Sequence, residues 1–172
     1  MRIYLVGYMG SGKSTLGKEL AKKIGFRLID IDEMIEKDTR KTIEKVFEEK
    51  GEDRFRVVEQ RLLRETKRMF NVVIATGGGA ACYEDNMDWM NQNGITVYLK
   101  VSPGAIFHRL TQAKAQRPLI KSVQDVDLME MIQAHLVLRE PFYEKAKHTI
   151  KGDAVKVAKL MTQLKLEAKQ LP

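Results

Sequence analysis

The sequence predicts an α/β fold in three layers, in which a five-stranded parallel sheet is covered by helices on both faces. Short apolar runs alternate with longer amphipathic segments along the chain, and this alternation is typical of strand-helix-strand units. The length of 172 residues is also close to the usual size of one domain, and 44% of the residues are hydrophobic, which allows a buried core. We therefore expect residues 1–172 to form a single domain.

Five short apolar runs are the predicted strands of this sheet. Each run is flanked by an amphipathic segment, and continuous apolar runs of this length are typical of strands that are buried on both faces. The predicted strands cover residues 3–6, 26–29, 72–75, 95–99 and 148–150.

Helices are predicted between these strands from the spacing of apolar side chains. Apolar residues recur at helical intervals over residues 16–24, 51–69 and 157–164, and the last of these segments is expected to close the fold as a surface helix. Ser102 followed by Pro103 is typical of an N-cap with proline at the first helical position.

Two polar insertions interrupt the alternation. One runs from about residue 33 to 61, between the second and third strands, and the other from about 109 to 125. Insertions at the carboxyl edge of a parallel sheet are where substrates bind and where loops close over them. We expect the first to bind substrate and the second to act as a lid.

Composition limits the location and the partners of the chain. The single cysteine, Cys82, excludes an intrachain disulfide and a thiolate zinc cluster, so we expect a reducing, cytoplasmic location. No run of about 18 apolar residues occurs, which argues against a membrane-spanning helix, and the apolar residues 1–6 are too short for a signal sequence. The net charge of +7 suits anionic partners.

A phosphate-binding motif follows the first predicted strand directly. Residues 7–15 read GYMGSGKST and match G-x-x-x-x-G-K-[ST] at Gly7, Gly12, Lys13 and Ser14. The glycines let consecutive backbone N–H groups point at phosphate oxygens, and the N-terminus of the following helix adds positive charge. The motif therefore predicts a nucleoside triphosphate site of the P-loop type.

Two acids lie at the end of the second predicted strand. Asp30 and Asp32 are two residues apart, which in an extended chain places both carboxylates on one face, beside the phosphate loop. One acid would support a metal shell and the other would accept a hydrogen bond from an attacking hydroxyl. The alternative is that these acids cap the following helix.

Three further motifs are compatible with the binding of an anionic acceptor. Arg56 and Glu59 are spaced to pair on one helix, which would hold the guanidinium in place for a carboxylate; a surface ion pair is the alternative. The run TGGG at residues 76–79 would expose backbone N–H groups to a ligand, or form a flexible turn. Arg117, in the second insertion, would reach the transferred phosphoryl group, or lie in a solvated loop.

Taken together, these motifs resemble the signature of the shikimate kinase family. In order, they read GYMGSGKST, DID, FRVVE, TGGG, QRPLI and LREPFY, and the resemblance extends from about residue 3 to 143. It implies the fold of the nucleoside-monophosphate-kinase group and transfer of the γ-phosphate of ATP to the 3-hydroxyl of shikimate, on the route to chorismate. Leu110 stands where many members have an arginine that packs on adenine, although Arg109 is adjacent.

The resemblance also implies roles for individual residues. Asp32 would bind the ring hydroxyls of shikimate, and Arg56 and Arg139 would bind its carboxylate. The other implied substrate-binding residues are Phe55, Glu59 (which would orient Arg56), Gly78 and Gly79.

On the nucleotide side, the resemblance implies a magnesium ion bound by Ser14 and, through water, by Asp30. Lys13, Asp32 and Arg117 would be the catalytic residues. The implied ATP-binding residues are Gly10, Ser11, Gly12, Lys13, Ser14, Thr15 and Arg117.

Two other functions fit parts of the sequence. A kinase of another small polyol acid, such as gluconate, or of a nucleoside monophosphate would share the phosphate loop. A nucleic-acid-binding ATPase would use the positive charge, but the lysines of the C-terminal segment are typical of a solvated face, and no nucleic-acid motif accompanies them. We expect a monomer that binds ATP and shikimate and has neither a nucleic-acid nor a membrane partner.

Overall fold

A single parallel sheet forms the centre of the molecule. The computed structural model describes residues 1–112 and 125–167, and within them the strand order is β2-β3-β1-β4-β5. All five predicted strands are confirmed to within one residue at either end. Their bounds are β1 (Arg2–Val6), β2 (Arg27–Asp30), β3 (Val72–Ala75), β4 (Ile95–Lys100) and β5 (His148–Lys151).

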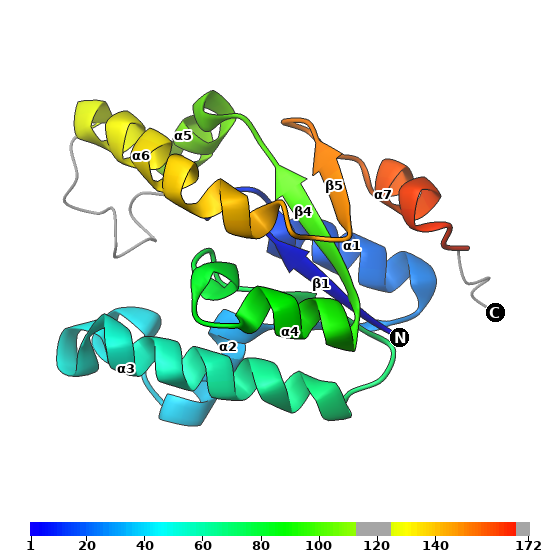
Figure 1. The fold of residues 1–172 in the computed structure, drawn as a ribbon, viewed down its shortest axis with the longest axis horizontal. Coiled ribbons are helices and arrows are strands. Elements are labelled where there is room, and N and C mark those ends of the chain that lie inside the picture. Colours follow the sequence, from blue (N-terminus) through cyan, green and yellow to red (C-terminus); the bar gives the residue numbers. More distant parts are fainter. Residues whose placement is uncertain (113–124, 168–172) are drawn as a thin grey trace.

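Helices cover both faces of this sheet, as the sequence predicts (Figure 1). They are α1 (Lys13–Ile24), α2 (Ile31–Thr39), α3 (Ile43–Glu65), α4 (Asn86–Asn93), α5 (Pro103–Gln112), α6 (Asp125–Tyr143) and α7 (Val157–Leu164), with short 3₁₀ turns η1 (Thr66–Arg68) and η2 (Ala80–Cys82). Within the described part of the chain, none of these helices has both the length and the apolar character needed to cross a membrane.

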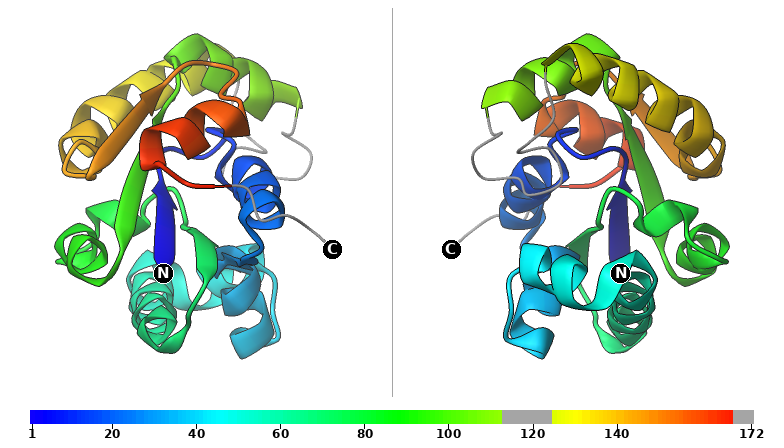
Figure 2. Two further views of the ribbon diagram at one scale, coloured as in Figure 1. Left: turned by 90° about the vertical axis from the view of Figure 1, so that its right-hand side faces the viewer. Right: turned by 90° about the vertical axis from the view of Figure 1, so that its left-hand side faces the viewer.

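The two faces of the sheet belong to separate hydrophobic clusters, which explains the three layers seen in Figure 2. Ile3 and Leu5 of β1 pack with apolar residues of α1 and α7. Tyr4 and Val6, which alternate with them, pack with residues of α3, α4, α5 and α6. Because successive side chains of a strand point to opposite faces, one strand contributes to both clusters.

The carboxyl ends of three strands meet at one edge. Leu5 is in register with Ala75, and Asp30 is in register with the same Ala75 from the other side. The segments that follow β1, β2 and β3 therefore start side by side. The glycine-rich motif follows β1, the two acids lie at the junction of β2 and α2, and the TGGG run follows β3, so the sheet brings the predicted site together.

The helix predicted over residues 51–69 begins earlier than expected. Helical structure starts at Ile43, where the Thr42 hydroxyl caps the helix by accepting a hydrogen bond from the backbone N–H of Lys45 at 3.3 Å. Gly51 has φ 74° and ψ 173°, which is not helical, so α3 is two helices joined at a break. The predicted cap at Ser102 is confirmed, since its Oγ accepts from the N–H of Ala105 at 3.2 Å.

Candidate active site

The glycine-rich loop between β1 and α1 has the backbone geometry that its sequence requires. Gly7, Gly10 and Gly12 have φ values of 141°, 78° and 91°, which side chains with a Cβ rarely adopt. The Nζ of Lys13 folds back over the loop and donates to the carbonyl oxygens of Gly7 at 2.8 Å and of Tyr8 at 2.9 Å. The loop is therefore a formed cradle with its lysine inside.

A serine and an aspartate meet at the mouth of this loop. The Ser14 hydroxyl donates to Oδ2 of Asp30 at 2.6 Å, so the predicted pair of metal-supporting residues is brought together. A hydroxyl and a carboxylate oxygen are ligands that Mg²⁺ accepts, directly or through water. The arrangement is compatible with a magnesium ion bound beside the phosphates.

The prediction of an extended chain through both acids is wrong. Strand β2 ends at Asp30, whose Oδ1 accepts a hydrogen bond from the backbone N–H of Asp32 at 3.0 Å and so caps α2. The capping alternative therefore holds for one oxygen of Asp30, while its other oxygen faces Ser14. Asp32 lies in the first turn of α2 and lines the neighbouring cavity.

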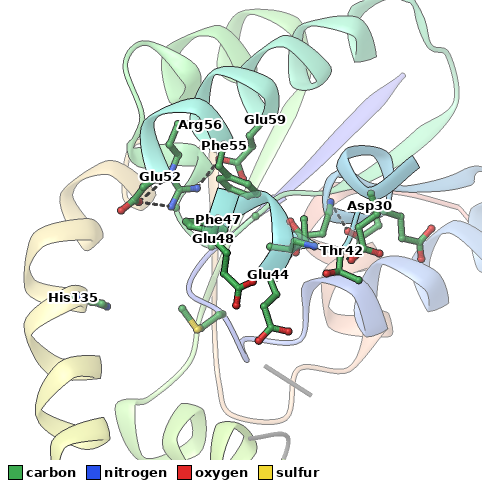
Figure 3. A pocket seen from close by; sticks show the side chains of 18 of the residues that line it. Asp30, Thr42, Glu44, Phe47, Glu48, Glu52, Phe55, Arg56, Glu59 and His135 are labelled. Atoms are coloured by element: carbon green, nitrogen blue, oxygen red, sulfur yellow. Dashed lines mark hydrogen bonds and ion pairs between the residues drawn. The ribbon is translucent and has the colours of Figure 1, made fainter. Parts of the chain in front are cut away.

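A cavity of about 900 Å³ opens next to the phosphate loop, between α2, α3, the loop after β3 and α6 (Figure 3). It brings together all seven residues that the sequence predicts to bind substrate. They are Asp32, Phe55, Arg56, Glu59, Gly78, Gly79 and Arg139. Sequence reasoning missed other lining residues, among them Met9, Phe47, Glu52 and His135.

The Arg56–Glu59 pair is a buried part of this cavity, so the alternative of a surface ion pair is wrong. Nη1 of Arg56 donates to Oε2 of Glu59 at 2.7 Å, and the side chain of Glu59 is only 1% exposed. On its other side Arg56 donates to Glu52 at 3.1 and 3.3 Å, as the dashed lines in Figure 3 show. Carboxylates on two sides thus fix the guanidinium.

Burial and the neighbouring charges together set the pKa values of this pair. Burial raises the pKa of Glu59, and the charge and hydrogen bond of Arg56 oppose that rise. Burial alone would lower the pKa of Arg56, but Glu59 and Glu52 outweigh it and raise the pKa. The guanidinium stays charged, and within the described residues Oε1 of Glu59 has no hydrogen-bond partner.

The TGGG run forms a turn that packs directly against these charged groups. A Cβ on Gly79 would overlap the guanidinium of Arg56, and one on Gly77 would overlap Oε1 of Glu59. A Cβ on Gly78 would lie 2.9 Å from the backbone nitrogen of Met9. The missing side chains leave the room that the buried ion pair occupies.

The second predicted arginine reaches the cavity from α6. The guanidinium carbon of Arg139 lies 5.4 Å from the centre of the Tyr8 ring, and Arg139 lines the same cavity as Arg56. Arg117 lies outside the described residues, as does most of the predicted lid at 109–125. Its expected place beside the phosphates stays a prediction.

A smaller cavity of about 300 Å³ lies on the other side of the phosphate loop. Arg109 lines this cavity and donates to the carbonyl oxygens of Gly10, at 2.9 Å, and of Asp153. Leu110, next to it, is fully buried and packs on Gly10. This second cavity is lined by the motif residues Ser11, Gly12 and Thr15, together with Leu16, Glu19, Arg109 and residues 152–155.

The site combines a phosphate loop and its lysine with a hydroxyl-carboxylate pair. Beside them lies a cavity that two guanidinium groups line. Together these features define a class of protein. The class is that of P-loop kinases that phosphorylate a small anionic acceptor. Comparison with known proteins gives the family. The family model described as "Shikimate kinase" matches residues 9–169, and this chain belongs to the shikimate kinase family. It is a phosphotransferase that acts on an alcohol group.

Individual relatives agree with this assignment. A shikimate kinase of Phocaeicola vulgatus is 48% identical over 152 residues, which are 88% of this chain and 87% of the relative. The crystal structure of shikimate kinase from Bacteroides thetaiotaomicron is 43% identical, with a TM-score of 0.92 over 96% of this chain and 99% of the other. A shikimate kinase from Acinetobacter baumannii, solved in complex with shikimate, is 35% identical, with a TM-score of 0.85 over 95% and 89% of the two chains.

A more distant structure shares the fold alone. Deoxyadenosine kinase from M. mycoides is 18% identical, with a TM-score of 0.59 over 96% of this chain and 99% of that chain. This likeness agrees with the P-loop kinase fold that the sequence predicts.

Proposed function

We propose that this chain transfers the γ-phosphate of ATP to the 3-hydroxyl of shikimate, forming shikimate 3-phosphate and ADP on the route to chorismate and the aromatic amino acids. The observation that carries the proposal is the cavity beside the phosphate loop, in which Arg56 and Arg139 accompany Asp32. Shikimate is a small anion with vicinal hydroxyls, so its site needs guanidinium groups for the carboxylate and an acceptor for the hydroxyls. Membership of the shikimate kinase family supports the same substrate.

Each end of the acceptor has its own residues in this proposal. Arg56, which Glu52 and Glu59 hold from two sides, binds the carboxylate together with Arg139. Asp32, at the start of α2, accepts hydrogen bonds from the ring hydroxyls. Phe55 closes the wall of the cavity, and the backbone N–H groups of Gly78 and Gly79 add donors.

The nucleotide binds along the phosphate loop. The backbone of residues 10–15 and the ammonium group of Lys13 hold the phosphates, and Arg117 approaches from the lid. Ser14 and, through water, Asp30 hold Mg²⁺, whose charge offsets that of the phosphate oxygens when it is bound. The pairing of the Ser14 hydroxyl with the Asp30 carboxylate supports this assignment.

Charge and position account for the catalysis. Phosphoryl transfer passes through a loose transition state, so placing the 3-hydroxyl in line and neutralising the phosphate contribute more than removing a proton. Lys13 supplies positive charge at the transferred group. Asp32 orients the hydroxyl and accepts its proton late in the transfer, which makes it chiefly a positioning group.

A coupled ADP-release assay with a panel of small hydroxy acids tests the proposal. We expect rapid, magnesium-dependent turnover with shikimate and little with gluconate or nucleoside monophosphates. Neither of these combines one carboxylate with three hydroxyls on the same ring. Turnover of gluconate or of a nucleoside monophosphate, together with no turnover of shikimate, would overturn the proposal. We also propose that the protein acts as a monomer in the cytoplasm, with small molecules as its substrates.

A further inference from the structure

One side chain of the phosphate loop points away from the phosphates and toward the acceptor cavity. Tyr8 is the second residue of the loop and is only 1% exposed. Its hydroxyl lies 2.9 Å from Nδ1 of His135, and its ring lies 5.4 Å from the guanidinium carbon of Arg139. His135 and Arg139 are one helical turn apart on α6, and both line the acceptor cavity.

The backbone of the same residue belongs to the nucleotide site. The carbonyl oxygen of Tyr8 accepts hydrogen bonds from Nζ of Lys13 at 2.9 Å and from the backbone N–H of Ser11 at 3.1 Å. A single buried residue thus contacts the phosphate-binding lysine through its main chain and an acceptor-binding arginine through its ring.

We infer that Tyr8 is a positioning residue for Arg139, and that His135 fixes the orientation of the Tyr8 ring. A guanidinium is attracted to the face of an aromatic ring, so a fixed ring restricts where the guanidinium lies. Restricting a long, flexible side chain before the ligand arrives lowers the entropic cost of binding. This inference deepens the proposed function and rests on it, because it takes Arg139 to bind the carboxylate of shikimate.

The charges around His135 agree with this role. Burial and the charge of Arg139 lower the pKa of His135, while Glu52 on the facing helix α3 opposes that shift. Burial also raises the pKa of the Tyr8 hydroxyl. At neutral pH the imidazole is therefore uncharged, and the Tyr8 hydroxyl and Nδ1 of His135 share one hydrogen bond, in which the tautomer of the imidazole decides which of the two is the donor. Figure 3 shows His135 extending from α6 toward the other lining residues.

Steady-state kinetics of two variants at His135 test the inference. His135→Ala removes the hydrogen-bond partner of the Tyr8 hydroxyl, and we expect the KM for shikimate to rise about three- to ten-fold, with kcat and the KM for ATP changing less than about two-fold. His135→Asn places a side-chain oxygen near the position of Nδ1 and should restore most of the affinity for shikimate. If His135 only packed against its neighbours, its removal would not raise the KM for shikimate selectively, and asparagine would not restore the affinity.

The matched control is Val137→Ala, because Val137 lies on the same helix between the two residues and is 75% exposed. It should leave all kinetic constants at the wild-type values. An unchanged KM for shikimate in His135→Ala, or an equal rise in the KM for ATP, would overturn the inference.

Tyr8→Phe gives an independent measurement if His135→Ala fails to fold. It keeps the ring and removes only the hydroxyl, so it should raise the KM for shikimate as much as His135→Ala does. Combining the two changes should add little, since both remove the same hydrogen bond; additive losses would contradict the inference. If the wild-type enzyme turns over no shikimate, the proposed function fails as well, whereas wild-type turnover with unaffected variants rejects this inference alone.

Discussion

The nucleotide side and the acceptor side of the site are built in different ways. The phosphate loop is one continuous segment, and its shape comes from three glycines with positive φ and from a lysine that bonds to carbonyl oxygens five and six residues away. The acceptor cavity uses side chains from α2, α3, the loop after β3 and α6, which are brought together only by the tertiary fold.

The difference also concerns charge. On the nucleotide side, Lys13 is held by neutral backbone oxygens among the contacts described. On the acceptor side, Arg56 is held by two carboxylates, one of them buried. We infer that a change in the loop acts mainly on the chemical step, whereas a change in the cavity acts mainly on the affinity for the acceptor. The predictions below test this division, from the largest effect to the smallest.

Replacing the loop lysine should have the largest effect. Lys13→Ala removes the positive charge at the transferred phosphoryl group, and we expect kcat to fall by about 10²–10³-fold or more. Since the folded loop keeps its glycines, circular dichroism should show an intact protein. Lys18→Ala, on the exposed face of the same helix, is the matched control and should keep wild-type kcat. Substantial turnover by folded Lys13→Ala would show that the loop does not supply the charge.

Removing either arginine of the cavity should weaken the binding of the acceptor and leave the binding of the nucleotide unchanged. A charge-assisted hydrogen bond contributes about 1.5–3 kcal/mol, so Arg56→Ala and Arg139→Ala should each weaken shikimate binding by about 10- to 150-fold. Nucleotide affinity, measured by calorimetry with ADP, should stay at the wild-type value. Arg54→Ala serves as the control, because Arg54 is an exposed arginine two residues from Arg56. Equal losses for nucleotide and acceptor would break the proposed division.

Replacing Gly79 should also weaken the binding of the acceptor, by less than the loss of an arginine. Gly79 has φ −100°, so alanine is not strained there, but its Cβ would overlap the guanidinium of Arg56. We expect Gly79→Ala to displace Arg56 and raise the KM for shikimate about ten-fold, since small misplacements of binding groups are costly. Gly104→Ala is the control, because a Cβ there meets nothing within 4 Å. A wild-type KM in Gly79→Ala would show that Arg56 can move without loss of its function.

The contrast between the two regions explains what the sequence can predict. The phosphate loop and all five strands are local patterns, so their positions follow directly from the residues. The full set of seven acceptor residues follows only from the resemblance to a family, since no local pattern brings α6 next to α3. The expectation that the strand extends through Asp32 is wrong, because the spacing of two acids cannot distinguish a strand from a capped helix start.

His135 and Tyr8 escape prediction for a similar reason. Neither stands out in the sequence, and their hydrogen bond spans 127 positions of the chain. The one available signal is the four-residue spacing of His135 and Arg139 within a helical segment, which places both on one face. A buried ion pair such as Arg56–Glu59 is likewise indistinguishable from a surface pair by spacing alone, because burial depends on what packs above it.

The pH dependence of stability gives the smallest expected effect. Because burial and Arg139 lower the pKa of His135, the unfolded chain binds a proton near pH 6.5 before the folded chain does. The contribution of His135 to stability is therefore complete above about pH 6.5 and is lost as the pH falls below that value. Urea unfolding between pH 5 and 8 should show a shallower decline for His135→Asn than for the wild type.

Val137 offers the matched control for this measurement, since it is exposed on the same helix as His135 and does not titrate. Val137→Ala should leave the slope of stability against pH unchanged, because it removes no proton-binding group. The same slope in the wild type and in His135→Asn would mean that Arg139 and burial do not act on the imidazole.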